Sequence, residues 1–167
     1  MGALSKDEST VWRQFQKGKN TSTIAEEHTP EHWTPAYVSR VLNRAREKIA
    51  KTLKEHANSH RLDIETLSDY KGLLIGYDYQ TSSQVYIVYT EKLGIIVWYK
   101  HDSYGGRLCP QCPKMTECKE TLCTIIDEYN LPLRPDEKEL PITKQAIAVF
   151  NKLAAKETPR YKRKGGD

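Results

Sequence analysis

Four cysteines stand close together in the sequence and carry its clearest chemistry. Cys109, Cys112, Cys118 and Cys123 form a C-x2-C-x5-C-x4-C pattern. The first pair can converge on one ion from a tight turn, which two neighbouring prolines would stiffen. Four thiolates are the ligands of tetrahedral zinc and equally of a [4Fe-4S] cluster. We therefore expect a metal site, with zinc favoured and an iron–sulfur redox sensor as the alternative.

Cys123 has a second interpretation, because it lies beside Leu122 and Ile125 on an expected helix and could belong to the core. Elsewhere the chemistry is sparse. Five histidines are scattered, and the sequence has no H-E-x-x-H pair, no phosphate-cradling glycine loop and no nucleophile motif. The sequence therefore predicts a protein that is not an enzyme.

The element that could place charge against a partner is an expected helix over residues 34–57. Thr34 can cap it, and Pro35 suits the first helical position, where a missing N–H costs nothing. Apolar residues recur every three or four positions and give it a buried side: Val38, Val41, Leu42, Ala45, Ile49 and Leu53. Six basic residues against two acidic ones leave a charge of +6 − 2 = +4. The helix is therefore amphipathic, with a basic exposed face.

Two shorter helices are expected before it. Ser5 and Glu8 have the spacing of a capping box, and Gly18 is a stop signal for the helix that follows them. A second helix is expected from Asn20 or Thr21. Three helices in this order make a helix-turn-helix unit.

Residues 39–49, SRVLNRAREKI, resemble the fourth conserved region of bacterial sigma factors and the LuxR-type DNA-binding domain. Those families share the run L-x-R-A-R-x-K-[LI], which residues 42–49 match, and an isoleucine–alanine pair upstream, here Ile24 and Ala25. The resemblance covers the first third of the chain, and the turn between Ala25 and Val38 is longer than the family's usual turn. It implies that the N-terminal half of the third helix enters the major groove of DNA.

The resemblance also implies which residues contact DNA. Those facing base edges would be Ala36, Tyr37, Ser39, Arg40 and Asn43, and those near phosphates would be Lys19, Thr21, Arg44, Arg46 and Lys48. A guanidinium can fork onto guanine and a carboxamide onto adenine, so Arg40 and Asn43 are the best readers. The alternative for Arg44 and Arg46 is pairing with Glu47 or exposure to solvent.

The rest of the chain has a different pattern. Residues 58–71 are expected to be a connector, and short β-rich runs follow over 73–79, 85–90 and 95–100. Turn residues between the runs predict a three-stranded antiparallel meander. The aromatic strand residues are either a ligand platform or ordinary strand packing, which aromatic side chains suit in any case. Helices are expected over 116–130 and from about Thr143.

The whole sequence predicts an α+β protein. We expect a helix-turn-helix domain over 1–57, a connector over 58–71, a metal-binding domain that dimerises or senses over 72–158, and a basic mobile tail over 159–167. The net charge of +4 gathers in the third helix and the tail, which favours a polyanionic partner. No apolar run approaches the roughly 20 residues of a membrane span, so a soluble cytoplasmic protein is expected.

These observations predict a sequence-specific transcription regulator that binds double-stranded DNA as a homodimer, since such modules commonly occupy two half-sites. The alternative from another class is an adaptor that docks its basic module onto the transcription machinery. Salt-dependent DNA binding separates the two.

Overall fold

The computed structural model describes residues 4–100 and 115–158 and shows an α+β fold. In chain order the elements are α1 (Lys6–Gln16), α2 (Thr21–Glu27), the 3-10 turn η1 (Thr29–Glu31), α3 (Pro35–Ser59), β1 (Asp63–Leu67), β2 (Leu73–Asp78), β3 (Ser83–Thr90), β4 (Gly94–Tyr99), α4 (Met115–Tyr129), α5 (Pro135–Lys138) and α6 (Ile142–Glu157).

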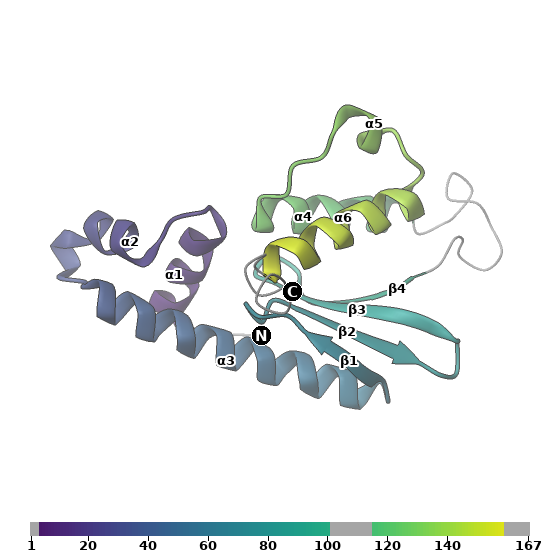
Figure 1. Ribbon diagram of the computed structural model, residues 1–167, viewed down its shortest axis with the longest axis horizontal. Coiled ribbons are helices and arrows are strands. Elements are labelled where there is room, and N and C mark those ends of the chain that lie inside the picture. Colours follow the sequence, from purple (N-terminus) through teal and green to yellow (C-terminus); the bar gives the residue numbers. More distant parts are fainter. Residues whose placement is uncertain (1–3, 101–114, 159–167) are drawn as a thin grey trace, which may run out of the picture.

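The elements form three layers with a helical unit at one end (Figure 1). The helical unit consists of α1, α2 and the N-terminal half of α3. The C-terminal half of α3 runs along one face of the sheet, and α4 and α6 lie on the other face. The helix that was predicted to read DNA therefore also supports the sheet.

The sequence explains where the first two helices begin and end. Ser5 Oγ accepts a hydrogen bond from the Glu8 N–H at 3.3 Å, and the Glu8 carboxylate accepts one from the Ser5 N–H at 2.9 Å. Gly18 follows α1 with a φ of +92°, where an L side chain would be strained. Asn20 caps α2 by accepting a hydrogen bond from the Thr23 N–H at 2.8 Å. The predicted capping box, stop and second helix are confirmed.

The longest helix, α3, has the predicted amphipathic pattern. Thr34 Oγ1 accepts a hydrogen bond from the Tyr37 N–H at 3.1 Å, and Pro35 is the first helical residue. All of the predicted core residues of this helix are buried. Although α3 has 25 residues, none of the helices that the structure describes is long and apolar enough to cross a membrane.

The sheet is antiparallel throughout, in the order β1-β2-β3-β4. The three predicted strands are confirmed as β2, β3 and β4. The prediction of a three-stranded sheet was wrong, because the expected connector contains β1, which pairs with β2. Residues 63–66 are all exposed, and the register shifts between Ile64 and Thr66. The strand thus has no apolar alternation from which it could be recognised.

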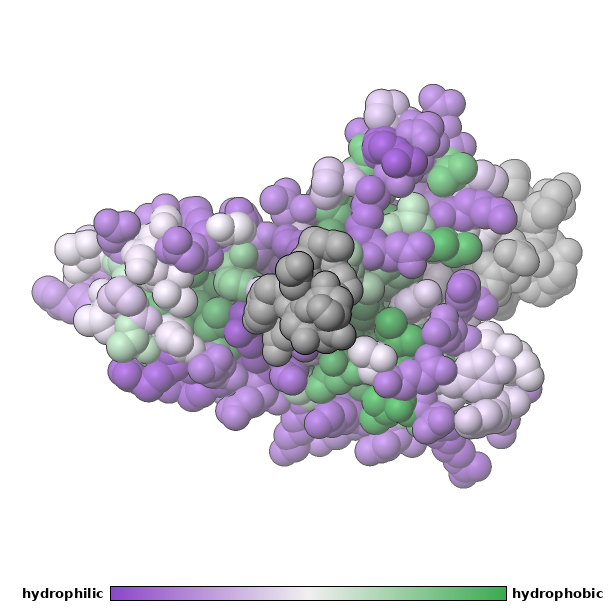
Figure 2. All heavy atoms as spheres, viewed as in Figure 1, coloured by the Kyte–Doolittle hydropathy of each residue, from purple (hydrophilic) through white to green (hydrophobic). Residues whose placement is uncertain are grey.

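One set of buried side chains continues from the helical unit into the sheet layers. Trp12 of α1 lies edge-on to Tyr89 of β3 and to Tyr129 of α4, with ring centroids 5.8 and 6.3 Å away. Phe150 of α6 stacks on Tyr86 with centroids 4.3 Å apart. Apolar residues, green in Figure 2, are visible in the middle of the molecule, between the helical unit and the sheet layers. These contacts favour the packing interpretation of the aromatic strand residues.

Candidate nucleic-acid interface

One exposed stripe of α3 carries the best DNA-reading candidates. At 100° per residue, five residues lie within about 80° of one another around the helix axis, opposite its buried side: Ala36, Arg40, Asn43, Lys51 and Lys54. The exposed acid Glu47 falls within the same arc but is not counted among the five. All five residues are exposed. In the described part of the chain, no acidic group forms an ion pair with Arg40, Lys51 or Lys54. We refer to these five residues as the α3 stripe.

Two further predicted base readers lie beside the stripe. Ser39 is exposed, whereas Tyr37 is half-buried. The Tyr37 hydroxyl donates a hydrogen bond to Asp7 Oδ2 at 2.6 Å, and this bond raises the pKa of Tyr37. Tyr37 therefore ties α3 to α1, and its hydroxyl is already engaged by Asp7 within the chain.

An acid of α1 holds two of the predicted phosphate contacts. Lys48 Nζ lies 2.8 Å from Glu8 Oε1, and Arg44 Nε lies 3.5 Å from Glu8 Oε2. Although burial opposes it, hydrogen bonds from Lys48 and from the Ser5 backbone hold the pKa of Glu8 below its usual value. The side chains of Arg44 and Lys48 are still 53% and 47% exposed. Each can therefore face a phosphate while it neutralises Glu8.

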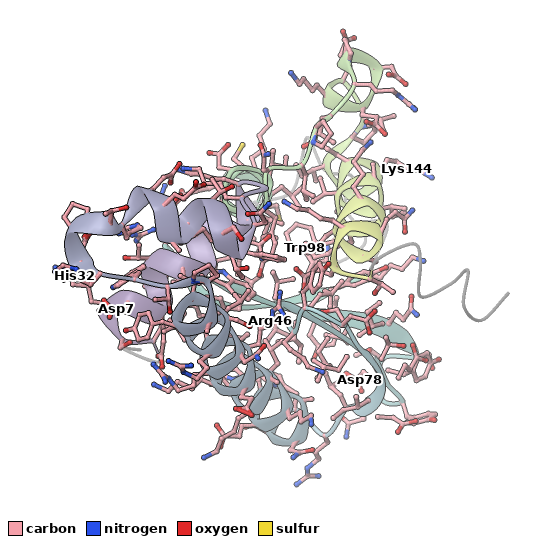
Figure 3. The ribbon with its side chains drawn as sticks, turned by 60° about the vertical axis from the view of Figure 1, so that its left-hand side comes forward. Asp7, His32, Arg46, Asp78, Trp98 and Lys144 are labelled. Carbon is pink, nitrogen blue, oxygen red and sulfur yellow. The ribbon has the colours of Figure 1, made fainter. Side chains whose placement is uncertain are left out.

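Arg46 has a different environment from its neighbours. Its guanidinium carbon lies 4.7 Å from the ring centroids of both Phe15 and Tyr70. Burial lowers the pKa of Arg46. Figure 3 shows Arg46 where α3 meets the rest of the molecule, because its position is about 120° around the helix from Arg40. This placement favours a structural role for Arg46 over the predicted phosphate contact. It also differs from both alternatives given for Arg46, which were pairing with Glu47 and exposure to solvent.

The two predicted phosphate contacts outside α3 lie at the start of α2. Lys19 Nζ is 2.8 Å from Glu27 Oε1, and Thr21 is the half-buried first residue of α2. Exposed ion pairs of this kind contribute little to stability. Lys19 can therefore exchange Glu27 for a phosphate at small cost.

The long turn between α2 and α3 is an ordered structure. It contains η1, and His32 follows it in the left-handed region with a φ of +61°. The His28 ring stacks on Trp33 with centroids 4.2 Å apart, and Trp33 contacts Tyr37 with centroids 5.5 Å apart. Asp7, the partner of Tyr37, lies at the same end of the molecule as His32 (Figure 3). The residues of this turn therefore support the N-terminal end of α3.

A buried polar cluster, the Glu157 junction, joins the helical unit to α6. Glu157 is 0% exposed, and its Oε1 accepts hydrogen bonds from Ser68 Oγ at 2.9 Å and from the Gly72 N–H at 2.7 Å. Burial raises the pKa of Glu157. Among the described residues, Glu157 Oε2, Arg46 Nε and the Gln16 side chain have no hydrogen-bond partner. The charge of Arg46 partly offsets the cost of burying this carboxylate.

Several contacts fix α1 against the sheet layers. Lys156 Nζ donates a hydrogen bond to the Gln16 carbonyl at 2.8 Å. Ser9 Oγ donates one to Glu91 at 2.5 Å, and Arg13 lies 3.4 Å from the same carboxylate. Together with the buried Trp12, these contacts give the α3 stripe a fixed orientation relative to the sheet.

The predicted metal ligands are only partly placed. Cys109 and Cys112 lie outside the described residues. Cys118 and Cys123 both lie on α4, about 140° apart around its axis and about 7.5 Å apart along it. Thiolates on one zinc ion must converge within bonds of about 2.3 Å, which these two positions do not allow on a regular helix.

Burial agrees with this separation. Cys118 is half-buried against the core, whereas Cys123 is exposed, so the interpretation of Cys123 as a core residue was wrong. Within residues 4–100 and 115–158, no group of three or more His, Cys, Asp or Glu side chains could hold a metal ion. The structure therefore does not bring the cysteines that it describes together as a metal site.

The acidic partners of α3 were missed by the sequence interpretation. Glu8 was recognised as a capping residue of α1, but its contacts with Arg44 and Lys48 depend on how α1 packs on α3. Asp7 had no signal beyond its place in the first turn. Glu157 is one of many charged residues in the last helices, and no local pattern marks it as buried.

Comparison of the chain with protein-family models, with curated proteins and with solved structures finds no match in any of the three.

Proposed function

We propose that this protein is a sequence-specific DNA-binding transcription regulator in which the N-terminal half of α3 enters the major groove. The observation that supports this most is the α3 stripe, an exposed surface whose three cations outnumber the one acid in its arc, Glu47, on a helix whose opposite side is buried. An α-helix fits the major groove, which is about 12 Å wide. The resemblance of residues 39–49 to known DNA-binding modules supports the same placement.

The residues of the stripe would have different roles. Arg40 would bind a guanine edge with two N–H groups, and Asn43 would pair with an adenine edge. Lys51 follows Arg40 by about 16 Å along the helix, at 1.5 Å per residue, which suits a phosphate beyond the bases being read. Arg44 and Lys48 lie beside the stripe and would contact the same DNA backbone.

Selection from a random duplex pool, followed by fluorescence anisotropy over a range of salt, tests this proposal. Arg40→Ala should lose about 1–3 kcal/mol of discrimination at one base pair. Lys51→Ala should weaken binding to all sequences and reduce the slope of log K against log salt by about one. Lys119→Ala, at an exposed position of α4, is the matched control and should change neither quantity.

Failure of the pool to enrich any sequence would contradict sequence-specific binding. Salt-independent binding, or none, would favour the adaptor alternative, in which the helical unit docks onto a protein assembly.

A thiolate metal site that draws on Cys109 and Cys112 is a second part of the proposal, with zinc favoured over an iron–sulfur cluster. Elemental analysis and a visible spectrum of anaerobically purified protein test it. Zinc in a colourless sample would support a structural site, and iron with a broad visible band would support a redox sensor. A sample without either metal would contradict this part alone.

A further inference from the structure

The two outer strands of the sheet differ in how they are protected. At one edge, β1 is short, carries Asp63 and Glu65, and has an irregular register. Such features keep an edge strand from pairing with another chain. At the other edge, β4 has the sequence GIIVWY, with no charged residue, and its register with β3 is unbroken. Among the described residues, no strand covers its outer side.

The hydrogen-bond pattern shows which backbone groups of β4 face outward. The Lys100 N–H donates to the Gln84 carbonyl at 2.9 Å, so these residues form a hydrogen-bonded pair. In an antiparallel ladder every second pair is of this kind, and the even-numbered residues of β4 therefore bond to β3. The N–H and C=O groups of Ile95, Val97 and Tyr99 point away from β3. We call these three residues the β4 edge.

The side chains of the β4 edge lie on the face of the sheet that α3 covers. The even-numbered face meets α6, since Phe150 stacks on Tyr86 and contacts Trp98. Side chains alternate along a strand, so the β4 edge has the opposite face, on which α3 packs against the neighbouring strands (Figure 1). All three side chains are only half-buried. Apolar surface and outward-facing backbone groups thus occur on the same three residues.

We propose that the β4 edge pairs antiparallel with the β4 edge of a second copy of this chain, joining two four-stranded sheets into one. A strand with no charge can meet its own copy about a two-fold axis without repulsion. The register that engages all three residues places Val97 opposite Val97 of the second copy and Ile95 opposite Tyr99. Each such pair exchanges two backbone hydrogen bonds. Lys100 then lies opposite Gly94, so this flanking lysine faces no like charge.

This pairing has a consequence for DNA binding, and that consequence alone rests on the proposed function. The two-fold axis of such a pair is perpendicular to the joined sheet, so both copies present the same face in the same direction. Both α3 helices then lie on one side of the dimer. Helix-turn-helix dimers that bind two half-sites need their recognition helices on one side.

Sedimentation equilibrium of the full chain tests the pairing. The wild type should have the mass of a dimer, and Val97→Lys should be a monomer, because a lysine at the centre of the pair faces its own copy. Ile64→Lys, at a position of β1 that is 39% exposed, is the matched control and should remain a dimer. Val97→Pro should also be a monomer that keeps its fold, because it removes only an outward N–H.

Hydrogen exchange of the wild type gives a measurement that needs no variant. In the dimer the amides of the β4 edge should exchange as slowly as those of Ile96 and Trp98. Dilution to the monomer should speed up exchange at the β4 edge but not at Ile96 and Trp98. A monomeric wild type, or a dimer that persists in both Val97 variants, would overturn the proposal. Loss of DNA binding in the α3 variants leaves the dimer mass unchanged, so the two proposals fail separately.

Discussion

Replacement of Arg46 by alanine should destabilise the fold substantially and affect DNA binding only through that loss. The guanidinium lies 4.7 Å from the centroids of two rings, and each contact at a partly buried site is worth about 1 kcal/mol. Arg46→Ala also removes a positive charge from the neighbourhood of the fully buried Glu157, at a cost of about 1 kcal/mol or more. We expect the free energy of unfolding to fall by about 3 kcal/mol.

Urea unfolding followed by tryptophan fluorescence measures this change. Arg46→Lys should lose less, because lysine keeps the charge but not the planar stacking of arginine. Arg40→Ala, at an exposed position, should stay within about 0.5 kcal/mol of the wild type. In a Glu157→Gln background the cost of Arg46→Ala should shrink by about 1 kcal/mol, because the charge it supported is gone.

The opposite result would refute this reasoning. If Arg46→Ala unfolds like the wild type but has a flatter salt dependence of DNA binding, then Arg46 contacts a phosphate, as its place in the sequence motif predicts.

Four further predictions concern the acids and the cysteines. Burial raises the pKa of Glu157, so its contribution to the free energy of unfolding is present below the usual carboxyl pKa and is lost as pH rises through the pKa of the folded protein. Unfolding of Glu157→Gln and of the wild type should therefore show the variant becoming relatively more stable as pH rises through that value. The lowered pKa of Glu8 has the opposite sign, so Glu8→Gln should cost about 1–3 kcal/mol at pH 7, and this difference should shrink as pH falls through the folded value. Glu8→Gln also releases Arg44 and Lys48 from their carboxylate partner. Anisotropy titrations should therefore show that this variant binds DNA more tightly and with a steeper salt dependence. Unchanged affinity would contradict phosphate contacts by Arg44 and Lys48. Peptide mass spectrometry after brief alkylation of the folded protein should find exposed Cys123 modified before half-buried Cys118, and equal protection of both would contradict their placement.

Much of the fold follows from local signals. The capping box at Ser5, the stop at Gly18 and the buried side of α3 depend on residues a few positions apart, and all three are confirmed. The strands β2 to β4 were recognised because apolar runs alternate with turn residues. In contrast, β1 is held by backbone pairing with β2 while most of its side chains are exposed, so no hydrophobic pattern in the sequence predicts it.

The candidate interface was harder to predict because its residues are sorted by contacts distant in sequence. The sequence alone does not distinguish the environments of Arg40, Arg44 and Arg46, since all three lie in one basic helix. Only the packing of α1, and of the segment between β1 and β2, separates them into an exposed cation, a partner of Glu8 and a side chain that contacts the rings of Phe15 and Tyr70. The metal prediction relied on the cysteine pattern alone; combined with the helix expected over 116–130, the same spacing already places Cys118 and Cys123 about 140° apart around one helix.

The most direct test of the DNA-binding proposal is an NMR titration of the isotope-labelled protein with the duplex that the selection enriches. The proposal predicts that the largest shifts of backbone amides fall on residues 36–43, with smaller ones near Lys51 and Lys54, and that added salt reverses all of them. Shifts confined to the sheet or to α6, or none at saturating DNA, would contradict the placement of α3 in the major groove.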